Sequence, residues 1–479
     1  RDYENTSSLP YNSNTLKYCR IRMRLTLAQG KRGLMMNSDK VDLVHYLNNP
    51  VECSCGRTHF AGIEFVEIGD EALDKVASIV RNAGYQKPFV IADCNTQKIA
   101  GEVVLEKLSK EGIPASSFVF DDPALSPNES ALGTLLMNFD PTCDLILGVG
   151  SGTINDLSRF FSYQLGMQYF IVATAPSMDG YASSVAPLLK NNLKTTFECH
   201  VPKAIVADLD ILSKAPVEMI AAGFGDVLGK YTCLADWQLS AIINDEYYCD
   251  RVAALTSHSL EKTIGLRKGI ASGDKKAIGE LMETLILSGV AISYVGNSRP
   301  ASGSEHHLAH FWEMRLLWGG RSHVLHGTNV GIGTVLILQL YQYLLQENLD
   351  PKTFESIQAP LSDTWSADIE RVFLEGASEV LALEEKARKN DLELHKDRLA
   401  AIAQNWDQIL QTLATVPSPA EARALLAEVH APFEPAHVGI EPQLVSDALI
   451  FAKEIRARYT VLQLLWDLNL LRNFAGRIV

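Results

Sequence analysis

The chain has 479 residues, 47% of them hydrophobic and 21% charged, which excludes a disordered or fibrous protein. Its length predicts two or three packed domains. The formal net charge of −14 argues against a nucleic-acid partner or an anionic-membrane surface. Eight scattered cysteines do not predict a disulfide framework.

No apolar run reaches the length of a bilayer span, and the longest, LILSGVAISYVG from Leu285, predicts a buried helix. We therefore expect a cytoplasmic protein without a membrane span. Residues 1–45 contain neither an uninterrupted apolar stretch nor a clear cleavage site, so we expect a poorly ordered extension there.

From Gly62 onward, short apolar runs alternate with amphipathic segments. This alternation predicts a parallel α/β sheet. The predicted strands are 63–68, 88–93, 116–120, 144–150 and 169–176, and the predicted helices are 71–84, 97–112, 129–137 and 154–166. Beyond about residue 210 the periodicity is helical throughout. We therefore predict an α/β nucleotide-binding domain over 46–208 and an all-α domain over 209–479.

The segment DLILGVGSGTINDLSRF carries the first chemical motif. An apolar strand runs into Gly148, Gly150 and Gly152, and Thr153 opens a helix. Backbone N–H groups and the positive helix end at such a turn suit a phosphate, although a tight turn alone also needs glycine. The spacing is GxGxG, and the acid that could bind a ribose, Asp93, lies upstream instead of downstream. This predicts a nucleotide-binding fold other than the standard Rossmann type; a simple strand-end turn is the alternative for Asp93.

The next strand ends in TAPSMDGYASS, which contains Asp179 and several hydroxyl residues, Ser177 among them. Loops at the carboxyl ends of parallel strands are where open α/β sheets bind ligands. A turn stabilised by the aspartate side chain is the other interpretation.

Five of the twelve histidines lie between 306 and 326, in GSEHHLAHFWEM and HVLHGTN. His306 and His310 are four residues apart on a predicted helix and share a face, whereas His307 points elsewhere. One imidazole from this helix, that of His326 and one carboxylate predict a three-ligand metal site with an open position. Asp226 in AAGFGDVLGK is the best carboxylate, because an isolated buried acid needs a cation. Surface histidines and a helix cap are the alternative.

Five motifs in order, GVGSGTINDLSRF, TAPSMDGYASSVAPL, GFGDVLGK, SGSEHHLAHFWEM and HGTNVGIGT, resemble the bacterial sn-glycerol-1-phosphate dehydrogenases. These belong to the superfamily of dehydroquinate synthases, glycerol dehydrogenases and iron-dependent alcohol dehydrogenases. The resemblance implies a dehydroquinate synthase-like fold, and NAD(P)H-dependent interconversion of dihydroxyacetone phosphate and sn-glycerol 1-phosphate. It covers residues 50 to 345 densely.

The resemblance also implies residue roles. The metal ligands would be Asp226, His306 and His326, and the catalytic residues beside them Asp179 and His310. The cofactor-binding residues would be Asp93, Gly150, Ser151, Gly152, Thr153, Thr174, Ser177 and Ser183. The metal would be zinc, with nickel or iron as alternatives. An acid at Asp93 favours NAD(H) over NADP(H), because it repels a 2′-phosphate. Related enzymes suggest a homodimer.

Three points stay open. The substrate phosphate needs basic partners, and Lys190, Lys194, Lys230 and Arg321 are candidates by position only, each also interpretable as a solvated surface charge. The activity could instead be reduction of an unphosphorylated polyol ketone, as in glycerol dehydrogenases, or the chain could be a non-catalytic nucleotide-binding relative. CSCGRTH holds Cys53, Cys55 and His59; a structural metal is conceivable, but a fourth ligand is missing, so a tight turn is favoured.

Overall fold

The structure is a computed structural model that describes residues 46–191, 193–321, 324–361 and 363–479. The predicted N-terminal extension and His323 lie outside the described residues. All described residues belong to one compact unit, Leu43–Val479.

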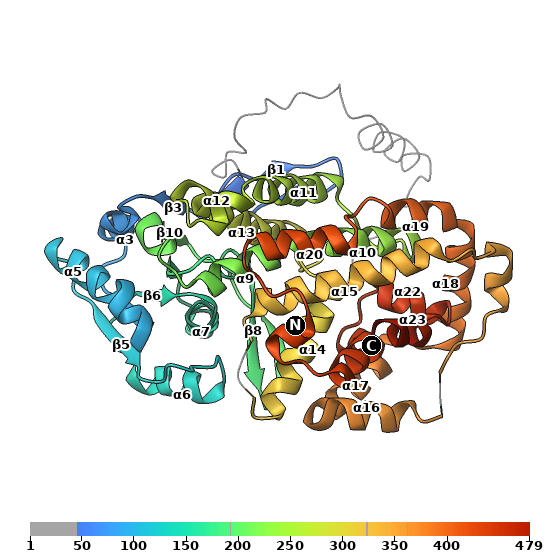
Figure 1. Cartoon of the computed structure of the whole chain (residues 1–479). Coiled ribbons are helices and arrows are strands. Elements are labelled where there is room, and N and C mark those ends of the chain that lie inside the picture. The colour runs from blue at the N-terminus through green and yellow to red at the C-terminus, as the bar shows by residue number, and fades with distance from the viewer. Residues whose placement is uncertain (1–45, 192, 322–323, 362) are drawn as a thin grey trace. The chain divides into compact units, whose positions relative to one another are not determined.

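A six-stranded parallel sheet forms the first part of this unit (Figure 1). Its strand order is β3-β10-β7-β6-β4-β5. The bounds are β3 Phe65–Gly69, β4 Pro88–Asp93, β5 Ser116–Phe120, β6 Leu145–Gly150, β7 Tyr169–Ala173 and β10 Ala204–Asp208. The predicted α/β architecture is confirmed, and all five predicted strands are present. β10 is an additional strand that the sequence reading did not identify.

Both faces of the sheet are covered. On one face, Val90, Leu147 and Val172 pack with helices on the same side into a core that includes Val80, Val104 and Leu108. Those helices are η1 Ala72–Lys75, α3 Val76–Asn82, α4 Cys94–Thr96, η2 Gln97–Gly101 and α5 Glu102–Lys110. On the opposite face lies α7 Gly152–Gln164, and α6 Glu129–Asn138 precedes β6. A sheet buried on both faces explains why its strands are continuous apolar runs.

Strand order reverses between β4 and β6, because the chain leaves β4 for the edge strand β5 and returns on the other side of β4. Open α/β sheets bind ligands at such a switch point, at the carboxyl ends of the strands. Asp93 ends β4 and Gly150 ends β6. The two predicted nucleotide-binding segments therefore lie at neighbouring strand ends.

Two antiparallel hairpins were not predicted. β8 Val185–Lys190 pairs with β9 Leu193–Glu198, and β1 Val51–Glu52 pairs with β2 Thr58–His59. The β1–β2 connection contains the predicted tight turn, in which Gly56 N–H donates to Cys53 O at 3.0 Å and Gly56 has φ 83°. A glycine is required there because this φ is left-handed.

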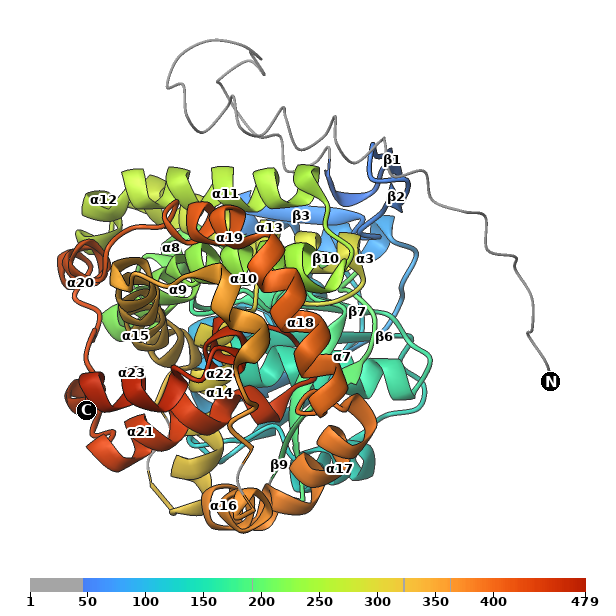
Figure 2. The same ribbon diagram turned by 90° about the vertical axis from the view of Figure 1, so that its right-hand side faces the viewer.

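After Asp208 the described residues contain helices and no strand, which confirms the predicted helical part (Figure 2). Its helices are α8 Leu209–Leu212, α9 Val217–Leu228, α10 Lys230–Asn244, α11 Asp250–Gly265, α12 Arg267–Ala271, α13 Lys275–Val295, α14 Ser304–Trp318, α15 His326–Gln346, η3 Pro351–Ser356, α16 Trp365–Phe373, η4 Leu374–Gly376, α17 Ala377–Ala387, α18 Leu392–Gln404, α19 Trp406–Leu413, α20 Pro419–Glu428, η5 Pro435–Val438, α21 Pro442–Phe451, η6 Ala452–Ile455, α22 Val461–Asp467 and α23 Leu471–Ile478.

Helix α13 contains the apolar run noted in the sequence. Asp274 caps its start by accepting from Ala277 N–H at 2.9 Å, and Gly296 ends it in the left-handed conformation. The helix is long and apolar enough to cross a membrane by length and composition, but 78% of its most apolar window is buried inside the structure. This is the pattern of a core helix, as predicted.

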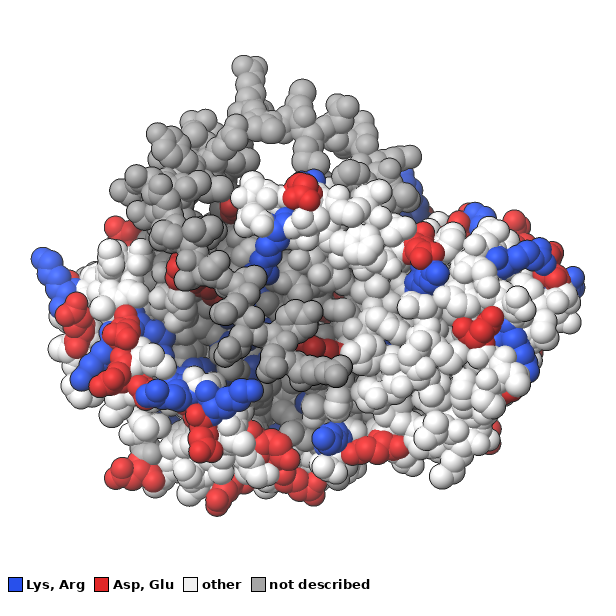
Figure 3. Space-filling view, turned by 180° about the vertical axis from the view of Figure 1, so that it is seen from behind, with Lys and Arg blue, Asp and Glu red and all other residues white. Residues whose placement is uncertain are grey.

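Figure 3 shows one face of the molecule, on which Lys and Arg side chains lie interspersed with Asp and Glu. Among the described residues, Lys75 with Glu67 and Arg81 with Glu111 form ion pairs near the surface. Such pairs contribute little to stability.

Helices α9 and α15 approach each other through glycines. A Cβ atom on Gly225 would lie 2.5 Å from Gly327 O, whereas one on Gly223 would lie 1.9 Å from the carbonyl oxygen of Pro176, in the loop after β7. A Cβ on Gly327 would lie 2.0 Å from Ala222 O. Since each obstacle is backbone, no side-chain rotation relieves the clash. The contact between the two helices therefore requires glycine at positions 225 and 327.

We expect Gly327→Ala to lower the midpoint of thermal unfolding, because the added methyl group must separate two helix backbones. Overpacking of this kind costs about 1–3 kcal/mol or more. The matched control is Gly133→Ala in α6, where a Cβ meets no atom within 4 Å; we expect it to leave stability unchanged or raise it by up to about 1 kcal/mol. Equal unfolding midpoints for the two variants, measured by calorimetry, would contradict the proposed constraint.

Candidate active site

Three helices bring the predicted metal ligands together. Asp226 lies near the end of α9, His306 in the first turn of α14, and His326 is the first residue of α15. One ligand atom from each lies within 4.8 Å of the other two. Asp226 Oδ1 is 3.7 Å from His306 Nε2, and the rings of His306 and His326 have centroids 5.2 Å apart. The structure thus assembles the set from three separate sequence segments.

Each of the two imidazoles is oriented by a carboxylate. His306 Nδ1 lies 2.7 Å from Glu305 Oε1, and His326 Nδ1 lies 2.7 Å from Glu313 Oε1. A metal-bound histidine usually donates its other ring N–H to a carboxylate in this way. With Nδ1 engaged, the Nε2 atom of each ring is left as the ligand atom. The donor set of two imidazoles and one carboxylate therefore fits a divalent metal with an open coordination position.

Asp226 is fully buried, and its charge is compensated by specific partners. Lys230 Nζ lies 3.0 Å from Asp226 Oδ1, and Asp179 N–H donates to Asp226 Oδ2 at 3.0 Å. Burial opposes the ionised form, but Lys230 and the two imidazoles lower the pKa of Asp226 below its ordinary value. The carboxylate is therefore an anion and available as a ligand.

Lys230 is only 1% exposed, so the interpretation of this lysine as a solvated surface charge is wrong. Its ammonium also lies 2.6 Å from Asp179 Oδ2 and donates to Ala301 O at 3.1 Å. Burial disfavours the cation, but Asp179 and Asp226 raise the pKa of Lys230. The lysine thus joins the predicted catalytic Asp179 to the predicted ligand Asp226.

His310 lies beside the ligand set, with its ring centroid 5.4 Å from that of His326. Arg456 Nη2 donates to His310 Nδ1 at 3.1 Å. Because a guanidinium only donates, the neutral His310 ring carries its proton on Nε2. Burial, then the charges of Lys194 and Arg456, hold the pKa of His310 well below its ordinary value. A second possible ligand group, His310, Glu313 and His326, shares a residue with the first, but Glu313 is already bonded to His326 and paired with Lys194.

The glycine-rich turn opens α7 as the sequence predicted, one residue earlier than Thr153. The helix begins at Gly152, and the side chain of its N-cap residue Ser151 forms no capping hydrogen bond. Backbone N–H groups of the first turn are then free to bind an anion. Gly150 has a packing role, since a Cβ there would lie 2.6 Å from Ile154 Cβ. A Cβ added to Gly152 would have only Met178 within 4 Å, at an ordinary van der Waals distance.

Asp93 caps the short helix α4. Its Oδ1 accepts from Asn95 N–H at 2.8 Å and from Thr96 N–H at 2.9 Å. The turn interpretation of Asp93 is therefore correct as a local description. Its position at the β4 end, beside the glycine turn, is also the position expected of a ribose-binding acid.

The loop after β7 carries the remaining predicted residues, and Thr174, Ser177 and Ser183 are all buried. Thr174 N–H donates to Gly150 O at 3.2 Å, which ties this loop to the glycine turn. The Ser183 hydroxyl accepts from Val185 N–H at 3.1 Å. Sequence reading missed the side chain that holds the loop: Arg159, fully buried, donates to the carbonyl oxygens of residues 180, 181 and 185.

The four basic residues that are candidates for binding the substrate phosphate lie in different places in the structure. Lys194 pairs with Glu313 and so lies at the ligand cluster, as Lys230 does. Arg321 donates to Gly439 O and lies 3.6 Å from Glu441, and Lys190 is exposed at the end of β8. Sequence reading missed Arg456, which directly follows η6 and contacts His310. Burial lowers the pKa of Arg456 to about 10, and only the charge of Glu313 raises it. The positive charge of this guanidinium is therefore incompletely compensated.

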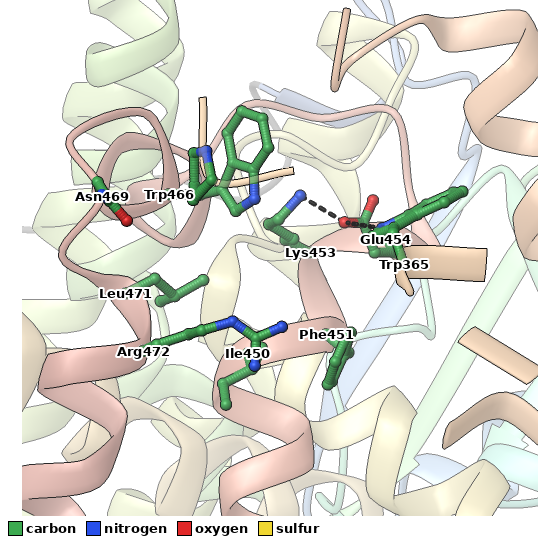
Figure 4. A pocket seen from close by; sticks show the side chains of 10 residues that line it. Trp365, Ile450, Phe451, Lys453, Glu454, Trp466, Asn469, Leu471 and Arg472 are labelled. Atoms are coloured by element: carbon green, nitrogen blue, oxygen red, sulfur yellow. Dashed lines mark hydrogen bonds and ion pairs between the residues drawn. The ribbon is translucent and has the colours of Figure 1, made fainter. Parts of the chain in front are cut away.

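The helical part also contains a cavity that is lined by residues outside the predicted site. Figure 4 shows Lys453 pointing toward Glu454, whose carboxylate also accepts from Trp365 Nε1 at 3.4 Å. The cavity measures about 30 Å³, which is room for roughly one water molecule. None of its lining residues belongs to the predicted site.

Comparison with known proteins agrees with this geometry. Residues 67–216 match the family described as iron-containing alcohol dehydrogenase. The glycerol-1-phosphate dehydrogenase (NAD(P)+) of Halalkalibacterium halodurans is 34% identical over 415 residues, which are 86% of this chain and 94% of that protein. The enzyme of the same name from Geobacillus stearothermophilus is 34% identical over 422 residues, 87% of this chain and 96% of that protein.

Solved structures share the fold. Glycerol dehydrogenase from Schizosaccharomyces pombe superposes with a TM-score of 0.56 at 16% identity, covering 87% of this chain and 90% of that one. NADH-dependent butanol dehydrogenase A from Thermotoga maritima gives a TM-score of 0.55 at 15% identity, covering 86% and 96%. These confirm the predicted dehydroquinate synthase-like architecture. Because its sequence identity to curated members exceeds 30% over nearly their whole length, the chain belongs to the glycerol-1-phosphate dehydrogenase family of NAD(P)-dependent oxidoreductases.

Proposed function

We propose that this protein interconverts dihydroxyacetone phosphate and sn-glycerol 1-phosphate with NAD(P)H. The observation that carries the proposal is the cluster of Asp226, His306 and the half-buried His326, with the cations of Lys194 and Arg456 beside it. The first three suit a metal, and the last two suit an anionic group of the substrate. In this proposal residues 46–208 bind the nucleotide, and residues 209–479 supply the metal ligands.

Asp226, His306 and His326 would hold one divalent ion, which we propose is zinc, with nickel or iron as alternatives. When bound, such an ion polarises a ketone carbonyl and stabilises the negative charge that develops on its oxygen. Glu305 and Glu313 keep both imidazoles in the tautomer that exposes Nε2. Lys230 and Asp179 N–H hold the Asp226 carboxylate in place.

The carboxyl ends of β4, β6 and β7 would hold the nucleotide, which when bound would supply the hydride for reduction. Ser151, Gly152 and Thr153 offer backbone N–H groups for its pyrophosphate, and Gly150 permits the close strand-to-helix turn. We propose that Asp93 binds the adenosine ribose and favours NAD(H) over NADP(H), and that Thr174, Ser177 and Ser183 line the nicotinamide side.

His310 and Asp179 are the proposed catalytic residues. The Arg456 hydrogen bond keeps the His310 proton on Nε2, and the lowered pKa keeps the ring neutral. A neutral ring with an N–H donor at the metal cluster can hold a proton close to the substrate oxygen. Asp179 acts through its pair with Lys230, which fixes its carboxylate at 2.6 Å from the ammonium.

Lys194 and Arg456 are the proposed phosphate partners. Lys194 is held at the cluster by Glu313, and Arg456 donates to His310 at 3.1 Å. A partly buried guanidinium suits a phosphate because it donates several hydrogen bonds in one plane. An unphosphorylated ketone would leave this charge uncompensated.

The predicted homodimer and cytoplasmic location stay predictions.

The direct test is NADH consumption by metal-loaded protein with dihydroxyacetone phosphate, using dihydroxyacetone as the control. We expect rapid turnover of the phosphate only, with a product that an sn-glycerol-3-phosphate-specific enzyme does not oxidise. Comparable turnover of dihydroxyacetone would favour a glycerol dehydrogenase instead. Absence of turnover with zinc, nickel and iron would refute the proposed reaction.

We expect His306→Gln to lose the cluster metal and to lower kcat by about 10²-fold or more, because removal of an electrostatic stabiliser has this cost. Metal content is measured by mass spectrometry after dialysis, and activity with NADH. The exposed His258→Gln on α11 is the matched control, with both quantities unchanged. Full activity of His306→Gln would exclude His306 as a ligand.

We expect Arg456→Met to raise the KM for dihydroxyacetone phosphate roughly tenfold or more, since a hydrogen bond to a charged group contributes about 1.5–3 kcal/mol. The KM for dihydroxyacetone should change little, because that substrate has no phosphate, while kcat with both substrates should fall because Arg456 also fixes the tautomer of His310. The control is Arg472→Met, whose side chain is 59% exposed. An unchanged KM for the phosphate would show that the anion binds elsewhere.

A further inference from the structure

A second group of metal-ligating side chains lies outside the proposed active site. Cys53, Cys55, His59 and Cys249 each place a ligand atom within 4.8 Å of the other three. The Sγ atoms of Cys53 and Cys249 are 3.6 Å apart, and His59 Nε2 lies 3.4 Å from both Cys55 Sγ and Cys249 Sγ. All three cysteines are free thiols. The fourth ligand that the CSCGRTH motif lacks is therefore supplied by Cys249.

The distances match a tetrahedral coordination shell. With Zn–S bonds of about 2.3 Å and a Zn–N bond of about 2.0–2.1 Å, the edges of a tetrahedron are about 3.8 Å between sulfurs and about 3.5 Å between sulfur and nitrogen. The one S–S distance and the two S–N distances given above are each within about 0.2 Å of these values. Because simple contact between two thiols gives a similar spacing, the distinguishing feature is that ligand atoms of all four residues lie within 4.8 Å of one another.

Local structure prepares each ligand. The turn between β1 and β2 is closed by Cys53 N–H donating to Arg57 O at 3.2 Å, and Gly56 takes the left-handed φ that reverses the chain. This turn places both cysteines of the motif beside His59 in β2. Cys249 occupies the N-cap position of α11, which lies next to the hairpin (Figures 1 and 2).

The surroundings of the cluster also favour a metal. His59 Nδ1 lies 2.9 Å from the carbonyl oxygen of Tyr294, and since a carbonyl only accepts, the ring proton is on Nδ1. His59 Nε2 then has its lone pair directed at the cysteines, as in a metal-bound histidine. The ring also stacks on Tyr294, at 5.1 Å and 8°. Tyr247 OH lies 3.2 Å from Cys55 Sγ, where it can donate to a thiolate.

We propose that Cys53, Cys55, His59 and Cys249 bind a structural zinc ion that fastens the β1–β2 hairpin to the start of α11. Three thiolates and one imidazole fill a tetrahedral shell and leave no open position, which is the structural rather than the catalytic pattern. Soft sulfur ligands in this geometry select zinc over magnesium or calcium. The site is separate from the one built on Asp226, His306 and His326, and it would exist whatever substrate the enzyme takes.

The test is zinc content per chain in purified, dialysed protein. We expect the His306→Gln variant to retain one zinc, and Cys249→Ser and Cys55→Ser each to lose one equivalent relative to the wild-type protein. Cys143→Ser, which changes a buried free cysteine outside the cluster, is the matched control and should keep the wild-type content. Cys249→Ser should also retain dehydrogenase activity at a temperature where it stays folded.

A spectroscopic measurement on the unmutated chain decides the question if the variants fold poorly. Protein loaded with cobalt in place of zinc should show sulfur-to-cobalt charge-transfer absorption, and X-ray absorption at the zinc edge should show sulfur neighbours. Zinc content that is equal in wild type and Cys249→Ser, or the absence of sulfur neighbours, would overturn the proposal. A Cys53–Cys249 disulfide in protein purified without reductant, detected by mass spectrometry, would overturn it as well.

Discussion

The backbone contact between α9 and α15 is the constraint on which the proposed active site depends. Gly225 and Gly327 lack the Cβ atoms that would hold the two helices apart. Asp226 directly follows one of these glycines, and His326 directly precedes another. Asp226 and His326, two proposed ligands that are far apart in the sequence, are therefore positioned by the same contact that packs α9 against α15. Stability and metal geometry share one cause, so a change in the spacing of these helices alters both.

Burial of Asp226 is the main electrostatic cost of this arrangement. An uncompensated buried carboxylate would be protonated or would destabilise the fold. In the structure this cost is offset by Lys230, one turn later on the chain, by two imidazoles and by a backbone N–H group. Glu305 and Glu313 form an outer layer of acids around the imidazoles. The site thus places Lys230 between the carboxylates of Asp179 and Asp226, and a further carboxylate behind each imidazole.

The predictable part of the fold is the part determined by local pattern. Strands 88–93 and 116–120 were predicted with their observed bounds, because a buried parallel strand is a short apolar run between helices. The β8–β9 hairpin was missed because Pro187 and a polar turn weaken its pattern. In the site, the histidines were recognisable from their clustering and from the family resemblance. Arg456 and Cys249 were not, because they lie 146 and 190 residues from the histidines that they contact, and nothing local in the sequence signals such pairing.

Net charge and local charge differ in this protein. The chain carries a formal charge of −14, which alone would repel a phosphorylated substrate. Around the histidine cluster, however, Lys194, Lys230 and Arg456 converge from β9, α10 and the segment after η6. Lys230 is paired with two carboxylates and Lys194 with one, whereas burial lowers the pKa of Arg456 and only the charge of Glu313 raises it. At these short distances in a partly buried site, local charges outweigh distant surface acids, which solvent and salt screen. An acidic protein can therefore present a cationic pocket, and the incompletely compensated arginine is the element of that pocket most directly suited to an anion.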